Sequence, residues 1–175
     1  MTARALGETA LELACFRRLR RAGPARSAAP CLLAVDEAAD PQARARGAAA
    51  MFHVCREQAA LRPEDQAGLV VHPLEPRGGH PFADLLTLGS AEDNDVVLAH
   101  PLVSWFHAYL AQDPSRGGWT LHDVGSARGT RVDGVEAPPE RPLRSRSLIE
   151  VSGSLLLVFL EPRDVDACLL APCDA

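Results

Sequence analysis

The feature that most constrains the fold is a change in hydrophobic pattern after Pro63. From that point, short apolar runs alternate with turn segments rich in Gly, Pro, Asp and Ser, such as 76–79 and 113–118. Many short strands separated by turns of this kind are typical of an antiparallel β-sandwich. The predicted strands lie at 69–71, 85–88, 96–98, 107–110, 119–121, 130–132, 148–151 and 155–159.

One turn carries a specific signal for a β-hairpin. Asp133-Gly134 stands between Val132 and Val135. The Asp-Gly pair readily adopts the positive φ angles that a two-residue hairpin turn requires. We therefore predict a tight hairpin at this position, within a region of about a hundred residues that is long enough to bury a two-sheet core.

The residues before Pro63 have a helical pattern instead. One helix is predicted at 9–21, and a second at 40–61, with Asp40 as its N-cap and Pro41 at its first position. The segment 31–35 between them is either a short strand or a buried turn. We predict a mainly β protein: a helical N-terminal extension at 1–64, a β-sandwich domain at 65–162 and a C-terminal tail at 163–175. The helices either pack on the sandwich or form a docking arm.

The charge distribution and the lengths of the apolar stretches limit the classes of partner that this chain is expected to bind. Residues 1–64 hold 10 Arg and 7 acidic residues, whereas residues 65–175 hold 8 Arg and 16 acidic residues. A β region with a net charge of −8 is a poor candidate for binding nucleic acid, where phosphate neutralisation dominates affinity. No apolar stretch reaches the length of a signal peptide core or a membrane span, so we expect neither a membrane partner nor secretion.

The five cysteines show neither a CxxC pair nor the His/Cys spacing of a zinc site. We therefore expect no metal and no cofactor. Free thiols in a reducing cytoplasm are the simpler interpretation, with a Cys168–Cys173 redox pair as the alternative.

Three short motifs, in order, resemble the pattern of the forkhead-associated (FHA) domain family. They are LGSAEDNDVVL at 88–98, VSWFHA at 103–108 and DVGSARGTRVDG at 123–134. The resemblance covers somewhat over half of the chain and implies the family's β-sandwich, whose loops at one end bind phosphothreonine peptides. A phosphate group needs a fixed guanidinium, a hydroxyl and backbone donors on rigid loops. By resemblance, Gly89, Asn94 and His107 are expected to brace these loops, with ligand contact as the alternative for His107.

The sequence also departs from the family pattern at the phosphate-binding positions. Ser90 stands where the family has its first arginine, Trp105 follows the motif serine in place of an arginine, and Arg128 replaces an asparagine. Ser104 matches the pattern, and Arg128 and Arg131 are candidates for supplying a cation from the opposite loop. The candidate partner-binding residues are Ser90, Ser104, Trp105, Arg128, Gly129, Thr130 and Arg131.

The motifs favour two binding functions over an enzymatic one. The first is a non-enzymatic adaptor for protein partners, with weakened or lost dependence on phosphothreonine. The alternative is a phosphothreonine-peptide reader with a rearranged site that uses Ser104 and Arg128, in which case the partner is a phosphoprotein. A hydrolase is disfavoured because neither a GxSxG elbow nor an HExxH motif occurs. The segment 125–129 has its serine at the wrong position for such an elbow.

Overall fold

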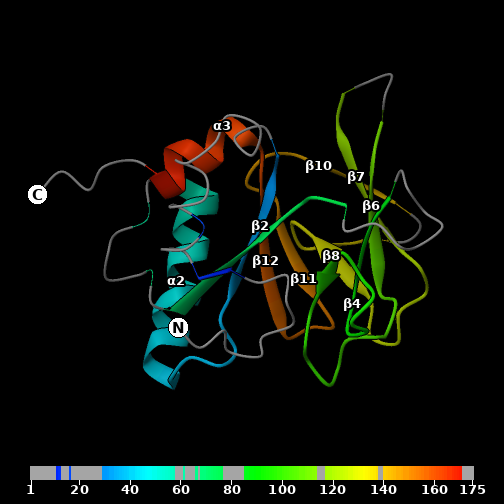
Figure 1. Cartoon of the computed structure of the whole chain (residues 1–175), viewed down its shortest axis with the longest axis horizontal. Helices are drawn as coiled ribbons and strands as arrows, with labels where there is room; N and C mark the ends of the chain where they lie inside the picture. Colours follow the sequence, from blue (N-terminus) through cyan, green and yellow to red (C-terminus); the bar gives the residue numbers. More distant parts are fainter. Residues whose placement is uncertain are drawn as a thin grey trace, which may run out of the picture.

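The computed structural model describes residues 11–12, 16, 29–57, 61, 66, 68–76, 85–113, 117–137 and 140–170. Within these residues, two β-sheets pack face to face, and helix α2 (Pro41–Glu57) lies on the outer face of one of them (Figure 1). The layers are therefore helix, sheet and sheet. No helix in the described part of the chain has the length and apolarity needed to cross a membrane.

The sheet next to the helix is antiparallel throughout and has seven strands among the described residues. Its spatial order is β1 (Leu11–Glu12), β3 (Leu69–Pro73), β2 (Cys31–Val35), β12 (Leu155–Leu160), β11 (Leu148–Val151), β8 (Thr130–Val132) and β9 (Val135–Glu136). The β8–β9 hairpin turns through Asp133 and Gly134, with φ values of 51° and 80°. The predicted tight turn is confirmed.

The second sheet has five strands in the described part of the chain. Its order is β10 (Arg141–Leu143), β7 (Trp119–Asp123), β6 (Ala108–Gln112), β4 (Leu85–Gly89) and β5 (Val96–Val97). The pair β4–β5 is parallel and the others are antiparallel, so this sheet is mixed where an antiparallel one was predicted. Strand β10 was not predicted, because its central residue is Pro142, which a strand tolerates only at an edge such as this one.

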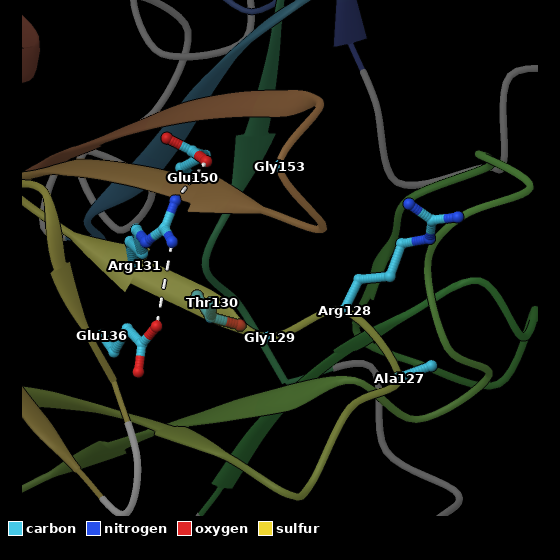
Figure 2. Close-up of a pocket in the computed structure, with 8 residues that line it drawn as sticks. All are labelled: Ala127, Arg128, Gly129, Thr130, Arg131, Glu136, Glu150 and Gly153. Carbon is cyan, nitrogen blue, oxygen red and sulfur yellow. Dashed lines mark hydrogen bonds and ion pairs between the residues drawn. The ribbon is translucent and has the colours of Figure 1, made fainter.

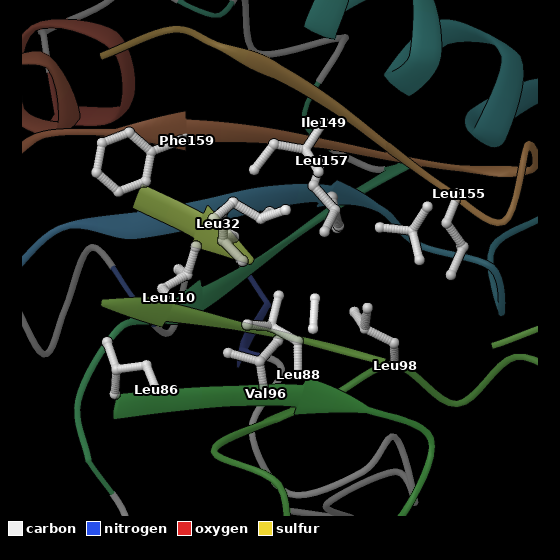
Figure 3. Packing of buried hydrophobic residues seen from close by; sticks show 14 of the residues in the cluster. Leu32, Leu86, Leu88, Val96, Leu98, Leu110, Ile149, Leu155, Leu157 and Phe159 are labelled. Carbon is white, nitrogen blue, oxygen red and sulfur yellow. The ribbon is translucent and has the colours of Figure 1, made fainter. Parts of the chain in front are cut away.

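The main core lies between the two sheets (Figure 3). Leu32 and Ala34 of β2 face it, whereas Cys31 and Leu33 of the same strand face a second core beneath α2. A strand buried on both faces has a continuous apolar run, not an alternating one. The sequence pattern of 31–35 therefore fitted a short strand and a buried turn equally well. The structure shows that this segment is a strand.

Strand β2 lies before the predicted boundary at residue 65, but its partner strands lie after it. It pairs with β12 on one side and with β3 on the other, which places it inside the seven-stranded sheet. The predicted helix at 9–21 is wrong at its start, because Leu11–Glu12 is strand β1 paired with β3. Phe16 is helical and buried, and the other residues of that prediction lie outside the described ones. Backbone pairing available only in the folded protein overrides the local helical pattern here.

Helix α2 begins as predicted. The Asp40 carboxylate accepts hydrogen bonds from the amides of Gln42 and Ala43 at 2.9 and 3.0 Å, and chiefly the bond from Ala43 lowers the pKa of this carboxyl. The side chains of α2 that are buried are Ala43, Ala50, Met51 and Val54. Phe52 of the same helix is 42% exposed.

The described part of the predicted C-terminal tail, 163–170, is helical and packed. Residues Pro162–Val165 form helix α3, which continues as a π-helical turn over Asp166–Leu170. Val165, Cys168 and Leu169 are buried in the second core. Cys31, Cys55 and Cys168 are free thiols, and Cys173 lies outside the described residues.

One arginine ties these helices to the sheet. The side chain of Arg146, which is 10% exposed, forms an ion pair with Asp164 at 3.1 Å and donates to the Val54 carbonyl at 2.8 Å. Arg146 therefore links the turn before β11 to both α2 and α3.

Candidate peptide-binding loops

Three loop segments meet at one end of the sandwich: 89–95 between β4 and β5, 104–107 before β6, and 123–129 between β7 and β8. Hydrogen bonds join them directly. The amide of Ser90 donates to the Ser104 carbonyl at 3.0 Å, and the amide of Ala127 donates to the Ser104 hydroxyl oxygen at 3.1 Å. Ser104 therefore stands between the other two segments.

The backbone of Trp105 is held from one side by the 89–95 segment. Its carbonyl accepts hydrogen bonds from the Asn94 side-chain amide at 2.7 Å and from the Ala91 backbone at 3.2 Å. A Cβ atom at Gly89 would fall well inside van der Waals contact with the same carbonyl, so this close approach requires glycine. Gly89 and Asn94 thus fix the position of the Trp105 backbone.

A buried carboxylate organises the 123–129 segment from within. Asp123 Oδ1 accepts from the amides of Gly125 and Ser126 at 2.9 and 2.8 Å. Its Oδ2 accepts from the hydroxyls of Ser126 and Thr130 at 2.8 and 2.6 Å. Burial alone would raise the pKa of Asp123, but these hydrogen bonds outweigh it and lower the pKa. The carboxylate is therefore ionised and fully bonded.

His107 extends this network to the motif serine. Its Nδ1 accepts from the Ser104 amide, which leaves the proton on Nε2 to face the Thr130 hydroxyl, both at 3.2 Å. Thr130 in turn donates to Asp123. Burial lowers the pKa of His107, although the nearby Asp123 charge opposes this, so the ring is neutral. A neutral ring of this tautomer satisfies the Ser104 amide, and a protonated one would not.

Above this buried network lies an exposed layer. Trp105 is 82% exposed, the most of any large hydrophobic residue described, and Phe106 and Val124 are 39% and 41% exposed. Val124 lies on the segment next to 104–107, because its amide donates to the carbonyl of His107 at 3.2 Å. The three side chains are named the apolar patch below.

The two candidate arginines lie on different sides of Gly129 (Figure 2). Arg131 contacts Glu150 at 3.4 Å and Glu136 at 3.7 Å, within a pocket at the ends of β8 and β11. Two carboxylates therefore compensate its charge. Arg128 also lines this pocket, but its exposed side chain points away from Arg131, and no ion pair of its guanidinium occurs within the described residues.

The structure separates the predicted site residues into three groups. Ser90, Ser104, Trp105 and Arg128 belong to the loop end, and Arg131 belongs to the ion-paired pocket. Thr130 was predicted as a partner contact, but it is 2% exposed and its hydroxyl is held between His107 and Asp123. Thr130 therefore stabilises the loops from the protein interior. Gly129 also has a supporting role, because its amide donates to the Ser126 hydroxyl.

Asp123 and Ser126, which organise the 123–129 segment, were not among the predicted site residues. The available signal was the order Asp-Val-Gly-Ser, because an aspartate shortly before glycine and serine often bonds the backbone amides that follow it. No group of three or more potential metal ligands occurs in the described part of the chain.

Comparison with known proteins identifies the family of this region. Residues 86–152, which are less than half of the chain, match the model of the FHA domain. No curated protein sequence matches the chain.

Several solved FHA structures are similar to this chain at low sequence identity. The FHA domain of the CT664 protein from Chlamydia trachomatis is 20% identical, with a TM-score of 0.43, over 52% of this chain and 84% of that one. The second FHA domain of a Mycobacterium tuberculosis ABC transporter is 28% identical, with a TM-score of 0.38, over 51% and 85%. Mycobacterium tuberculosis EmbR, solved with a low-affinity phosphopeptide, is 19% identical, with a TM-score of 0.44; the match covers 69% of this chain and only 31% of EmbR. The family assignment rests on the sequence match.

Proposed function

We propose that this chain is an adaptor whose FHA domain binds protein partners through the loop end, with weakened dependence on phosphothreonine. The FHA domain is a protein-interaction module, and no enzymatic family is indicated. The proposal concerns which ligand chemistry the loops accept. Ser90, Ser104, Trp105 and Arg128 are the proposed contact residues, and Asp123, His107 and Asn94 hold them in place.

The observation that carries the proposal is the charge of the three loop segments. They contain four carboxylates, at Glu92, Asp93, Asp95 and Asp123, but a single guanidinium, at Arg128. Arg131 adds little, because Glu136 and Glu150 already neutralise it. A phosphothreonine brings a charge of about −1.5 to −2 and needs donors that offset the loss of its hydration. A single exposed cation among carboxylates supplies little of this.

A second candidate is a phosphothreonine reader with a rearranged site. It is favoured by the adjacency of Arg128 to Ala127, whose amide bonds the Ser104 hydroxyl. Within the described residues the Ser104 hydroxyl has no acceptor for its own hydrogen, so it can donate to a ligand. A guanidinium and a hydroxyl side by side would then share a phosphate.

Matched peptide pairs distinguish the two candidates. A library with a fixed central phosphothreonine, and its unphosphorylated counterpart, would be screened against the full chain, and the best pair measured by fluorescence polarisation. We expect less than tenfold preference for the phosphorylated form. The Ser90→Arg variant should raise this preference about ten- to a hundredfold, because one charge-assisted hydrogen bond contributes about 1.5–3 kcal/mol.

The control variant is Arg128→Ala. In the adaptor model it changes the phosphate preference by less than threefold. Strong preference for phosphothreonine in the native chain, abolished by Arg128→Ala, would overturn the proposal in favour of the rearranged reader.

A further inference from the structure

We infer that the apolar patch of Trp105, Phe106 and Val124 is a docking surface for an unphosphorylated, basic and apolar segment of a partner protein. This inference rests on the proposed function and specifies its ligand. Trp105 takes the central place in it, because an exposed tryptophan is the side chain most often found at the energetic centre of protein interfaces.

The backbone of Trp105 is fixed by hydrogen bonds, while its side chain is exposed. Its backbone carbonyl accepts two hydrogen bonds from the turn at 91–94, and its neighbour Ser104 is bonded to His107 and Ala127. The indole itself is 82% exposed and has no ring partner within the described residues. A large apolar group on a fixed backbone loses little conformational freedom on binding, so more of its burial energy contributes to affinity.

The neighbouring charges select the partner. Glu92 and Asp93 form the exposed tip of the turn that bonds the Trp105 carbonyl, because Ala91 and Asn94 on either side of them make those bonds. Arg128 follows Ala127 on the other side of Ser104. Two exposed carboxylates against one guanidinium favour a cationic ligand at short range.

The net negative charge of the domain and the indole ring of Trp105 both favour a cationic ligand as well. Residues 65–175 carry 16 acidic residues and 8 arginines, so the domain as a whole attracts positive charge. The indole face also binds Lys and Arg side chains by cation–π attraction, worth about 0.5–1 kcal/mol at exposed sites and more when water is excluded. Lysine or arginine next to a leucine, valine or phenylalanine would satisfy both the patch and the acidic turn.

The test is a selection from a displayed library of random, unphosphorylated peptides on the full chain. Enriched sequences should contain an apolar residue adjacent to Lys or Arg and should be depleted in Asp and Glu. Affinity of a synthetic consensus peptide, measured by fluorescence polarisation, should fall about tenfold or more in Trp105→Ala. In the double variant Glu92→Gln/Asp93→Asn, affinity should fall several-fold. This loss should be smaller when salt is raised to about 0.5 M, because salt screens exposed charges.

Two matched controls accompany these variants. Phe52→Ala removes another exposed aromatic ring, on α2 behind the far sheet, and Glu136→Gln removes a carboxylate of the ion-paired pocket. Both should leave affinity unchanged. Enrichment of acidic peptides, an equal effect of Phe52→Ala and Trp105→Ala, or failure to select any binder would overturn the inference.

The outcomes also separate this inference from the proposed function. Acidic, Trp105-dependent binders would contradict the inference while leaving a phosphate-independent adaptor in place. Tight phosphothreonine binding through Arg128 in the matched-pair experiment would contradict the proposed function itself.

Discussion

The loop end and the covered face of the seven-stranded sheet are stabilised in different ways. The covered face is held by apolar packing of α2 and α3 on β2 and β12, with Arg146 as its main polar link. The loop end is held by hydrogen bonds that converge on Asp123 and His107, and its outermost side chains are exposed. Apolar burial contributes most of the folding free energy, whereas a polar network fixes geometry. Global stability should therefore depend on the covered face, and the shape of the candidate site on the network.

The largest expected effect comes from removing the N-terminal segment. A fragment that starts at residue 65 loses β2 and leaves the facing backbone groups of β3 and β12 without partners in the sheet. We expect this fragment not to fold cooperatively, as judged by circular dichroism and thermal melting against the full chain. A stable, protease-resistant fragment would instead support the boundary predicted from the sequence.

At the loop end, the largest effect should come from Asp123→Ala. This variant removes an acceptor of four hydrogen bonds and leaves the hydroxyls and amides around it unsatisfied. The free energy of unfolding should fall by about 3 kcal/mol, since hydrogen bonds to charged groups contribute about 1.5–3 kcal/mol each and part of the loss is recovered by water. Asp93→Ala, an exposed residue of the neighbouring loop, is the control and should change stability by less than about 0.5 kcal/mol.

Acid should act on two buried histidines: His107 at the loop end, and His72 on the face of the seven-stranded sheet that is turned toward the other sheet. Burial lowers the pKa of His72, in β3, to about 4, and burial also lowers that of His107. Because the folded pKa lies below the unfolded value of 6.5, stability is complete above pH 6.5 and is lost as the pH falls from 6.5 towards 4. For His72 the loss approaches about 3 kcal/mol.

Urea unfolding across this pH range measures the effect. His72→Leu should flatten the profile more than His122→Gln, which changes a partly exposed histidine on the outer face of the other sheet. A profile that is equally steep in both variants would place the acid-sensitive group elsewhere.

The hairpin turn gives a smaller, local effect. Gly134 has a φ of 80°, which a β-branched residue adopts only with strain. Gly134→Val should lower stability by about 1–3 kcal/mol, measured as a fall in melting temperature. Gly118→Val is the matched control, because Gly118 has no positive φ and open space around its Cα.

The smallest stability change should follow Trp105→Ala. The side chain is 82% exposed, so its loss leaves the unfolding free energy within about 0.5 kcal/mol while the docking surface is removed. A large destabilisation would mean that the indole packs within the fold and is not a surface anchor.

Much of the sandwich could be predicted because its signals are local. The eight strand segments proposed after Pro63 all contain strand residues, and Asp133-Gly134 forms the expected turn. Strand β10 and the placement of β2 could not be predicted, because an edge strand centred on Pro142 and a strand buried on both faces lack the alternating pattern. Strand β1 was missed for a different reason. The local pattern around Leu11–Glu12 is helical, but these residues pair with β3 in the folded protein.

For the candidate site, the sequence by itself determined which chemical groups the loops contain: a serine and a tryptophan at 104–105, one arginine at 128, and an excess of carboxylates. Only the tertiary structure decided which of them reach the surface. It buries Thr130 and Asp123 in one hydrogen-bonded network, pairs Arg131 with two glutamates and leaves Trp105 exposed. The physical reason is that charge and polarity belong to single residues, whereas burial and compensation depend on partners that lie far apart in the chain.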